Sequence, residues 1–209
     1  MKLYSYWRST TSVRVRAALN LKGVAYDYLP VDLVAGEQRG DYAAINPSKG
    51  VPSLILDDGR VLTQSMAILN YLEEVYPTPA LLPADPVHRA HVRATADCIA
   101  LDIHPVNNLK ILGYLKGSFG RSQDDAVDWM RHWMTEGFTA FQALIRDDTP
   151  LCFGDAPDLA DLCLMGQMVN ARRWGLDLAG FDRLVEIDAR LQQISALRDA
   201  LPEHQPDAS

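Results

Sequence analysis

Strand and helix patterns alternate over the first 76 residues of this chain, and only helical patterns follow a proline-rich stretch. The predicted order up to Tyr76 is β-α-β-α-β-β-α, in which Asp57-Asp58-Gly59 forms the tight turn between the last two strands. A β-α-β unit of this length implies two parallel strands joined by a right-handed crossover. The first part of the chain is therefore expected to fold as a small α/β domain.

The proline-rich stretch marks the expected domain boundary. It contains Pro77, Pro79, Pro83 and Pro86. A segment this rich in proline is extended and cannot continue a helix. We therefore expect one domain over residues 1–80 and an all-helical bundle over residues 86–209.

The second part of the chain carries no strand pattern. Helical patterns cover about 87–115, 124–146, 159–174 and 184–197. Asp158 and Asp161 have the spacing of a capping box at the start of the third of these helices. The residues after Leu201 are expected to form a loose tail.

Charge and cysteine usage exclude several classes of function. The net charge of −7 argues against a general affinity for nucleic acid or for an anionic membrane. No apolar run is long enough to span a bilayer, and the first residues show no signal core. The odd number of cysteines indicates a reducing, cytoplasmic setting, and neither their spacing nor the His88/His91 pair predicts a metal site.

Four consecutive hydroxyl residues, Ser9 to Ser12, lie between the first strand pattern and the first helix pattern, directly after Arg8. The first turn of a helix has free backbone N–H groups and the positive end of the helix dipole, so it favours an anion. One hydroxyl is enough to cap a helix, and a well-capped helix is the simpler interpretation. Four hydroxyls beside an arginine also fit a site for an anionic sulfur or a carboxylate.

Two further motifs, together with the element order, resemble the cytosolic glutathione transferases over nearly the whole chain. Val51-Pro52 before a strand resembles the cis-proline of their thioredoxin-like domain. Gln64-Ser65 follows the hairpin where this family holds the γ-glutamyl end of glutathione. Alone, a trans turn and a helix cap would explain these residues equally well. The resemblance implies a thioredoxin-like α/β domain followed by an all-α bundle, and a glutathione site formed by Gln38, Val51, Pro52, Gln64, Ser65, Asn107 and Asn108.

Within that family, the stretch from Arg8 to Leu19 resembles the zeta class, the maleylacetoacetate and maleylpyruvate isomerases. The class pattern is Ser-Ser-Cys, one or two residues, then Arg-Val-Arg-Ile-Ala-Leu. Thr10 replaces the second serine, and Thr11 stands where the family usually has cysteine. The related maleylpyruvate isomerases also carry threonine at that third position. Reductive dehalogenation that relies on this cysteine is therefore not expected. The resemblance assigns catalysis to Arg8, Ser9, Thr10 and Thr11, with Ser9 favoured as the match to the family's catalytic serine.

A proline at position 105 falls inside the helical pattern 87–115, where it is expected to kink the helix. Polar residues beside it suggest a surface that faces a cleft, although solvated side chains on a kinked helix explain them as well. The resemblance places Asn107 and Asn108 against glutathione, in part across a dimer interface. It assigns the substrate carboxylates to Arg8, His104, Lys110 and Arg173, although lysine lacks the fork of arginine and cations are common in a last helical turn.

The resemblance implies a glutathione-dependent cis–trans isomerase of aromatic catabolism. It would convert a maleyl-type keto diacid, maleylacetoacetate or maleylpyruvate, to its fumaryl isomer by reversible thiolate addition, as a homodimer. Hydrogen bonds to a thiolate favour its charged form, and positioned cations stabilise the charge that develops on the substrate. A general glutathione transferase or peroxidase for small electrophiles and a non-enzymatic interaction module of the same fold are the alternatives. The residues alone do not identify which diacid is the substrate. They also do not decide whether Ser9 or Thr11 donates to the thiolate.

Overall fold

The computed structural model describes residues 1–209, which form two compact units. Unit 1 comprises Met1–Leu81 and Leu191–Ser209, and unit 2 comprises Leu82–Arg190. The C-terminal segment from Leu191 belongs to unit 1, whereas the sequence led us to expect residues 86–209 in one helical domain. The reason is a set of hydrogen bonds that bring this segment onto the first helix.

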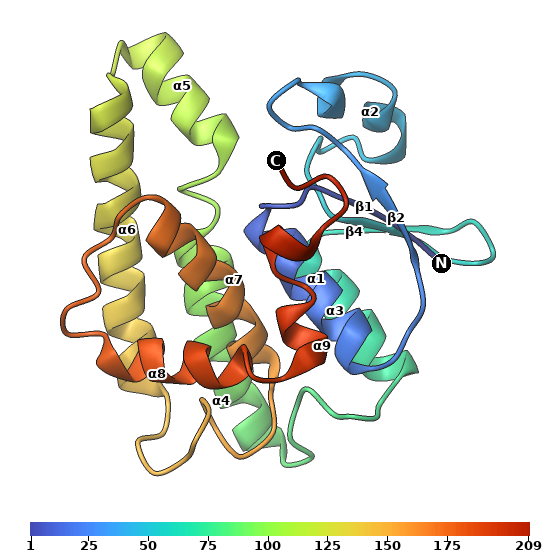
Figure 1. The fold of residues 1–209 in the computed structure, drawn as a ribbon, viewed down its shortest axis with the longest axis vertical. Helices are drawn as coiled ribbons and strands as arrows, with labels where there is room; N and C mark the ends of the chain where they lie inside the picture. The colour runs from blue at the N-terminus through green and yellow to red at the C-terminus, as the bar shows by residue number, and fades with distance from the viewer. The chain divides into compact units, whose positions relative to one another are not determined.

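Unit 1 is built on a four-stranded sheet of order β2-β1-β3-β4 (Figure 1). Strand β1 pairs in parallel with β2 and antiparallel with β3, and β3 pairs antiparallel with β4. These strands are β1 (Lys2–Ser5), β2 (Asp27–Pro30), β3 (Ser53–Ile55) and β4 (Val61–Thr63). The β-α-β-α-β-β-α order predicted from the sequence is confirmed.

Two helices, α1 (Thr10–Leu21) and α3 (Ser65–Val75), lie side by side in unit 1 (Figure 1). Leu3 of β1, Leu19 of α1 and Leu72 of α3 are fully buried. The loop between β2 and β3 contains the short helices η1 (Glu37–Arg39) and α2 (Tyr42–Ile45). Burial of these apolar side chains stabilises unit 1 and fixes the start of α1 at the end of β1.

The C-terminal segment of unit 1 is ordered, so the expectation of a loose tail is wrong. It contains α9 (Ser195–Arg198) and η3 (Pro202–His204). Arg16 donates from Nε and Nη2 to the carbonyl oxygen of Ala200, at 3.0 and 2.8 Å. Asp207 accepts hydrogen bonds from Trp7 N and from the Tyr28 hydroxyl. These partners are distant in the sequence, so no local pattern predicts them.

Unit 2 is entirely helical. Its helices are α4 (Pro86–Asp97), the π-helix η2 (Cys98–Ile103), α5 (Leu109–Phe119), α6 (Gln123–Leu144), α7 (Leu159–Arg173) and α8 (Asp182–Leu191). The capping box predicted for α7 is confirmed, with Asp158 as N-cap and Asp161 at the third helical position. No helix in the chain combines the length and the apolar character that crossing a membrane requires.

The pattern over 87–115 corresponds to α4, η2 and the start of α5, with a break after η2, and not to one kinked helix. The N–H of His104 bonds to the Ile99 carbonyl at 2.9 Å, which is π-helical spacing, and Pro105 has no N–H with which to continue. Trp129 Nε1 then donates to the carbonyl of Val106 at 3.0 Å. The break is therefore stabilised by bonds to α6, which the local sequence does not reveal.

Candidate functional site

The hydroxyl turn lies where β1 leads into α1, in unit 1. Ser9 is the N-cap of α1, and its Oγ accepts the N–H of Ser12 at 3.3 Å. The Ser9 and Thr11 hydroxyls are 2.9 Å apart, and Thr11 Oγ1 donates to the carbonyl oxygen of Val51 at 2.9 Å. Thr10 and Thr11 are buried, whereas Ser9 is partly exposed. The turn is therefore both a helix cap and a hydrogen-bonded chain that reaches the loop before Pro52.

That loop has a cis peptide bond between Val51 and Pro52, so the prediction of a cis-proline is confirmed. Its backbone is held by two side chains, since Asn46 Nδ2 and the Tyr42 hydroxyl each donate to the carbonyl oxygen of Gly50, at 2.7 and 2.6 Å. Burial raises the pKa of Tyr42, which keeps the phenol protonated as a donor. The carbonyl of Val51 therefore faces the hydroxyl turn from a fixed loop.

Gln64 and Ser65 form the start of α3 in the same unit. Gln64 adopts φ +69° and ψ +118°, a strained conformation for a residue with a side chain, and its amide makes no capping bond. Ser65 is buried in the first turn, where backbone N–H groups have no helical partners. Strain of this kind persists where the surrounding structure requires it, often at ligand-binding positions. The start of α3 can therefore hold a carboxylate.

Arg8 is held by aromatic rings. Its guanidinium carbon lies 5.5 Å from the centre of the Tyr6 ring and 5.0 Å from that of Trp7, and its Nε is buried without a hydrogen-bond partner. Cation–π contacts of this kind orient a guanidinium without neutralising its charge. Arg16 Nη2 donates to the carbonyl of Trp7 at 2.8 Å and so fixes the backbone beside it. Burial lowers the pKa of Arg16 to about 10, which leaves it charged at neutral pH.

Arg8 also lines a cavity of about 440 Å³ in unit 1, with Asp32, Glu37 and Asp207 among its other walls. The three carboxylates partly offset the positive charge of Arg8 within this cavity. Neither this cavity nor the one in unit 2 described below is lined by Ser9. The hydroxyl turn, and not a cavity, therefore identifies the candidate site of unit 1.

The family resemblance also assigns Gln38 to this site. It lies buried in η1, where its Nε2 donates to the carbonyl of Leu33 at 3.4 Å and its Oε1 has no partner. A buried amide oxygen without a donor is costly unless a ligand or water supplies one. Gln38 therefore retains hydrogen-bonding capacity that the protein itself does not use.

The polar segment after Pro105 lies in unit 2, and its amides have partners within that unit. Asn107 is buried and donates from Nδ2 to the carbonyl of Met130 at 3.1 Å, while its Oδ1 has no partner. Asn108 caps α5, since its Oδ1 accepts the N–H of Lys110 at 3.1 Å. His104 is partly buried and Lys110 is exposed. Both asparagines thus contribute to the fold, which the sequence pattern did not indicate.

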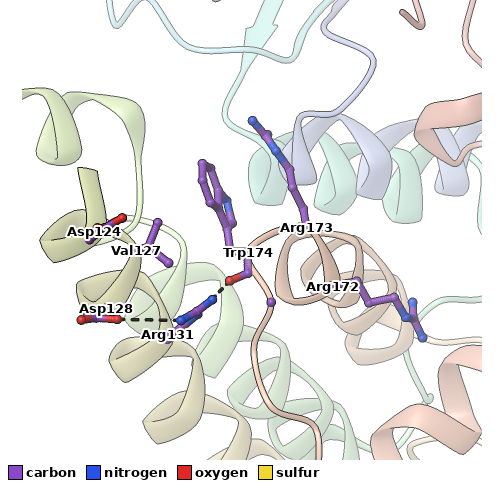
Figure 2. Close-up of a pocket in the computed structure, with 8 residues that line it drawn as sticks. Asp124, Val127, Asp128, Arg131, Arg172, Arg173 and Trp174 are labelled. Atoms are coloured by element: carbon purple, nitrogen blue, oxygen red, sulfur yellow. Dashed lines mark hydrogen bonds and ion pairs between the residues drawn. The ribbon is translucent and has the colours of Figure 1, made fainter. Parts of the chain in front are cut away.

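Arg173 borders a cavity of about 520 Å³ in unit 2, between α6 and the end of α7 (Figure 2). Its guanidinium carbon lies 4.7 Å from the centre of the Trp174 ring, and Trp174 Nε1 donates to Asn170 Oδ1 at 3.0 Å. Arg131 on α6 donates from Nε to the Trp174 carbonyl at 2.8 Å, and Figure 2 shows this bond at the C-terminal end of α7. No sequence signal indicates the pairing of Arg131 with Trp174, because only the fold brings them together.

The neighbouring arginine has a different role. Arg172 Nη2 lies 2.6 Å from Oδ2 of the fully buried Asp188, so this arginine neutralises a buried charge in unit 2. Figure 2 shows Arg172 and Arg173 pointing in different directions from the end of α7. Both arginines line the cavity, and the guanidinium of Arg172 is committed to Asp188. Nowhere in the chain do three or more metal-binding side chains gather into a group that could hold an ion.

Known proteins similar to this chain have the same architecture. Residues 1–74 match the family model described as the glutathione S-transferase N-terminal domain. A maleylpyruvate isomerase from Ralstonia is 47% identical, with all of both chains covered.

Solved structures agree with this match. A holo structure of a maleylpyruvate isomerase, described as a bacterial zeta-class glutathione S-transferase, is 46% identical with a TM-score of 0.97 over the whole of both chains. A maleylacetoacetate isomerase from Methylobacterium extorquens, with bound malonate and glutathione, is 37% identical with a TM-score of 0.96, again over both whole chains. The chain therefore belongs to the zeta-class glutathione transferases, in the group of the maleylacetoacetate and maleylpyruvate isomerases.

Proposed function

We propose that this protein is a glutathione-dependent cis–trans isomerase that converts maleylacetoacetate or maleylpyruvate to its fumaryl isomer. One observation carries the proposal. The Ser9 hydroxyl lies at the N-terminus of α1, in a hydrogen-bonded chain that ends on the carbonyl before the cis-proline, and Arg8 adjoins it. A donor at a helix N-terminus next to a fixed cation fits a thiolate and an anionic substrate together.

The residues of unit 1 fit glutathione, a peptide with two carboxylates and a thiol. We assign the peptide backbone to Val51 and Pro52, and the γ-glutamyl carboxylate to the strained start of α3 at Gln64 and Ser65. Gln38 has an unused buried oxygen that suits an ammonium or amide donor. Asn107 and Asn108 are assigned to glutathione as well, and the buried Oδ1 of Asn107 has no partner within its own unit.

When bound, glutathione supplies a thiolate that adds reversibly to the conjugated double bond of the substrate, which lowers the bond order so that the bond rotates. Ser9 and the α1 N-terminus favour the charged form of the thiol, since a hydrogen bond to an anion lowers its pKa. Arg8 binds the substrate and stabilises the negative charge that develops on its oxygen atoms. No net oxidation or reduction occurs, and no group is lost.

We assign the substrate carboxylates to Arg8, His104, Lys110 and Arg173. Arg8 and Arg173 are alike in being oriented by aromatic rings, at 5.0 Å from Trp7 and 4.7 Å from Trp174. An oriented guanidinium can form forked bonds to a carboxylate with little loss of side-chain entropy. Malonate bound to the Methylobacterium relative supports a small dicarboxylate as the ligand class.

The experiment follows the absorbance of maleylacetoacetate and, separately, maleylpyruvate, each with and without glutathione. Isomerisation of at least one diacid, dependent on glutathione, is the expected result. If neither diacid reacts while a chlorinated aromatic electrophile is rapidly conjugated, the protein is a general transferase and the isomerase proposal is wrong. The two diacids measured in parallel also identify the preferred substrate.

We further propose that the protein acts as a cytoplasmic homodimer in the catabolism of aromatic compounds. Exposed apolar side chains in unit 2 support a partner surface, because Leu101, Tyr114 and Phe119 are each more than half exposed. Sedimentation equilibrium measures the mass directly. A mass twice that of the chain is expected, and a monomer at micromolar concentration would contradict the dimer.

A further inference from the structure

We infer that Asp207 is a positioning residue for Arg8, which it holds in place through the backbone of Trp7. Asp207 belongs to the C-terminal segment of unit 1, in which the sequence indicates no site. The inference rests on the proposed function, since it concerns an arginine that we assign to the substrate carboxylates. It predicts that the affinity for a dicarboxylate depends on this segment, whereas the affinity for glutathione does not.

Arg8 depends on the two residues before it for its position. Its guanidinium carbon lies 5.0 Å from the centre of the Trp7 ring and 5.5 Å from that of the Tyr6 ring. The centres of these two rings are 6.1 Å apart, in an edge-to-face arrangement. A ring orients a cation only as firmly as the ring itself is held. The partners of the Trp7 backbone therefore determine how well Arg8 is fixed.

Both backbone polar groups of Trp7 bind charged side chains from other elements. The N–H of Trp7 donates to Asp207 Oδ2 at 3.2 Å, and its carbonyl oxygen accepts from Arg16 Nη2 at 2.8 Å. Arg16 is fully buried and also donates to the carbonyl oxygen of Ala200. The C-terminal segment thus reaches Trp7 twice, directly through Asp207 and indirectly through the bond of Ala200 to Arg16.

Asp207 is itself held by other parts of unit 1. Its Oδ1 accepts a hydrogen bond from the hydroxyl of Tyr28 on β2, at 2.6 Å. The chain just before it is anchored by the buried Gln205, whose Nε2 donates to the carbonyl oxygens of Asp199 and Leu201 at 2.9 and 2.8 Å. The two oxygens of the carboxylate are therefore bound on opposite sides, one to the sheet and one to the turn before α1.

The carboxylate supports Arg8 without occupying it. Asp207 and Arg8 line the same cavity, but the hydrogen bonds of Asp207 go to Trp7 and Tyr28. The buried Nε of Arg8 has no hydrogen-bond partner. An arginine presents its donors to a carboxylate in a fixed fork, so a guanidinium that is held by rings and not by an ion pair keeps those donors for a ligand.

The test compares the wild type with Asp207→Ala, Asp207→Asn and Tyr28→Phe, and repeats Asp207→Ala in the Arg8→Ala background. Tyr28→Phe is the matched control, because it removes the other bond of Asp207 and leaves the bond to Trp7. Three quantities are measured: kcat/KM for the diacid, the affinity for glutathione, and the affinity for malonate, a small dicarboxylate, by calorimetry with glutathione present. Thermal unfolding verifies that each variant is folded, and Asp207→Asn carries the comparison if Asp207→Ala does not fold.

Asp207→Ala is expected to lower kcat/KM about tenfold and to weaken malonate binding about as much, with less than about a twofold change in glutathione affinity. Asp207→Asn keeps an acceptor for the Trp7 N–H, so it should lower kcat/KM only about threefold. Tyr28→Phe should lower it less than about twofold. In the Arg8→Ala background Asp207→Ala should have no further effect, because Asp207 acts through Arg8.

Three results would overturn the inference. A loss of the same size with and without Arg8 would show that Asp207 supports the fold and not the arginine. A loss in Tyr28→Phe as large as that in Asp207→Ala would show the same. Tighter malonate binding by Asp207→Ala would show that the carboxylate competes with the ligand for Arg8.

Malonate binding requires no turnover, so the outcomes separate this inference from the proposed function. A wild type that binds malonate in an Asp207-dependent manner but isomerises neither diacid would refute the isomerase and leave the role of Asp207 intact. An active isomerase with unchanged kcat/KM in Asp207→Ala would refute the role of Asp207 alone. A wild type that neither binds malonate nor isomerises a diacid would refute both.

Discussion

The starts of α1 and α5 are both capped by a polar side chain, yet only the start of α1 has the features of a candidate catalytic site. Ser9 accepts the N–H of Ser12 in the first turn of α1, and Asn108 accepts the N–H of Lys110 in the first turn of α5. The Ser9 hydroxyl also donates onward, through Thr11, to a loop 40 residues away, whereas the cap of α5 is a local bond. A helix cap is a stronger candidate for a binding site when its side chain also has a hydrogen-bond donor that residues distant in the sequence hold in place.

The cations beside the two caps differ in the same way. Arg8 precedes the α1 cap and is oriented by two aromatic rings, while Lys110 follows the α5 cap and is exposed to solvent. A fixed guanidinium loses less entropy on binding a carboxylate than a mobile ammonium does. We therefore expect the chemistry to depend on unit 1 more strongly than on the polar segment of unit 2.

The largest expected effect comes from removing each cap in turn. Ser9→Ala should lower kcat by about 100-fold or more, because it removes a donor to the thiolate, a loss typical of an electrostatic donor at an active site. Asn108→Ala should lower kcat less than about threefold, with its effect on glutathione confined to KM, while destabilising the fold by about 1 kcal/mol, as loss of a helix cap does. Steady-state kinetics and thermal unfolding measure both. Equal losses of kcat in the two variants would contradict the claim that the start of α1, and not the start of α5, supports catalysis.

The next effect concerns Arg8. Arg8→Ala should lower kcat/KM for the diacid by about 10- to 100-fold, since a charge-assisted pair to the substrate is lost, and leave glutathione binding nearly unchanged. Arg8→Lys should recover part of the activity. Glutathione affinity by calorimetry is the control, and equal losses in turnover and in glutathione affinity would place Arg8 in the glutathione site instead.

A matched pair at the end of α7 tests whether unit 2 contributes to substrate binding. Arg173→Ala should raise KM for the diacid by about tenfold with little change in stability. Arg172→Ala leaves Asp188 buried without its cation, so it should destabilise the fold by about 1–2 kcal/mol, a value reduced for the partial exposure of Arg172. Kinetics and chemical denaturation separate the two effects. If Arg172→Ala changes KM and Arg173→Ala changes stability, their roles are reversed.

The smallest expected effect tests how the C-terminal segment supports the α1 turn. Asp207 accepts from Trp7 N and from Tyr28, whose pKa is raised by burial and by this bond. Asp207→Asn should destabilise the fold by about 1 kcal/mol and lower kcat/KM about threefold, because the backbone beside Arg8 loses a charged acceptor. Urea denaturation and kinetics provide the measurement. If neither the stability nor kcat/KM changes, the C-terminal segment packs on unit 1 without supporting the turn at the start of α1.

Local patterns in the sequence predicted most of the fold. Strand and helix periodicity gave the element order of unit 1, and the spacing of Asp158 and Asp161 gave the α7 cap, whereas the cis bond at Val51-Pro52 followed from the family resemblance. What escaped prediction depends on contacts between distant residues. The bonds of Asp207, the break before α5 and the Arg131–Trp174 contact have no signature within a short window of sequence.

The candidate site shows the same limit. The motif Arg8 to Ser12 identified the turn, but only the structure supplies the Val51 carbonyl, and that acceptor assigns the protons of Ser9 and Thr11. Conversely, Asn107 and Asn108 have the residue type of ligand contacts, while much of their hydrogen bonding is used within unit 2. Residue type and spacing indicate where a site lies, and the partners of each polar atom determine what it can do.

The most direct test of the account is a crystal structure of the protein with glutathione. The sulfur atom should lie within hydrogen-bonding distance of Ser9 Oγ, with the Thr11 hydroxyl still bonded to the carbonyl of Val51. A sulfur bound to Thr11 Oγ1 with the Val51 bond broken would contradict the assignment of the thiolate to Ser9. A sulfur remote from the start of α1 would contradict the assignment of the site itself.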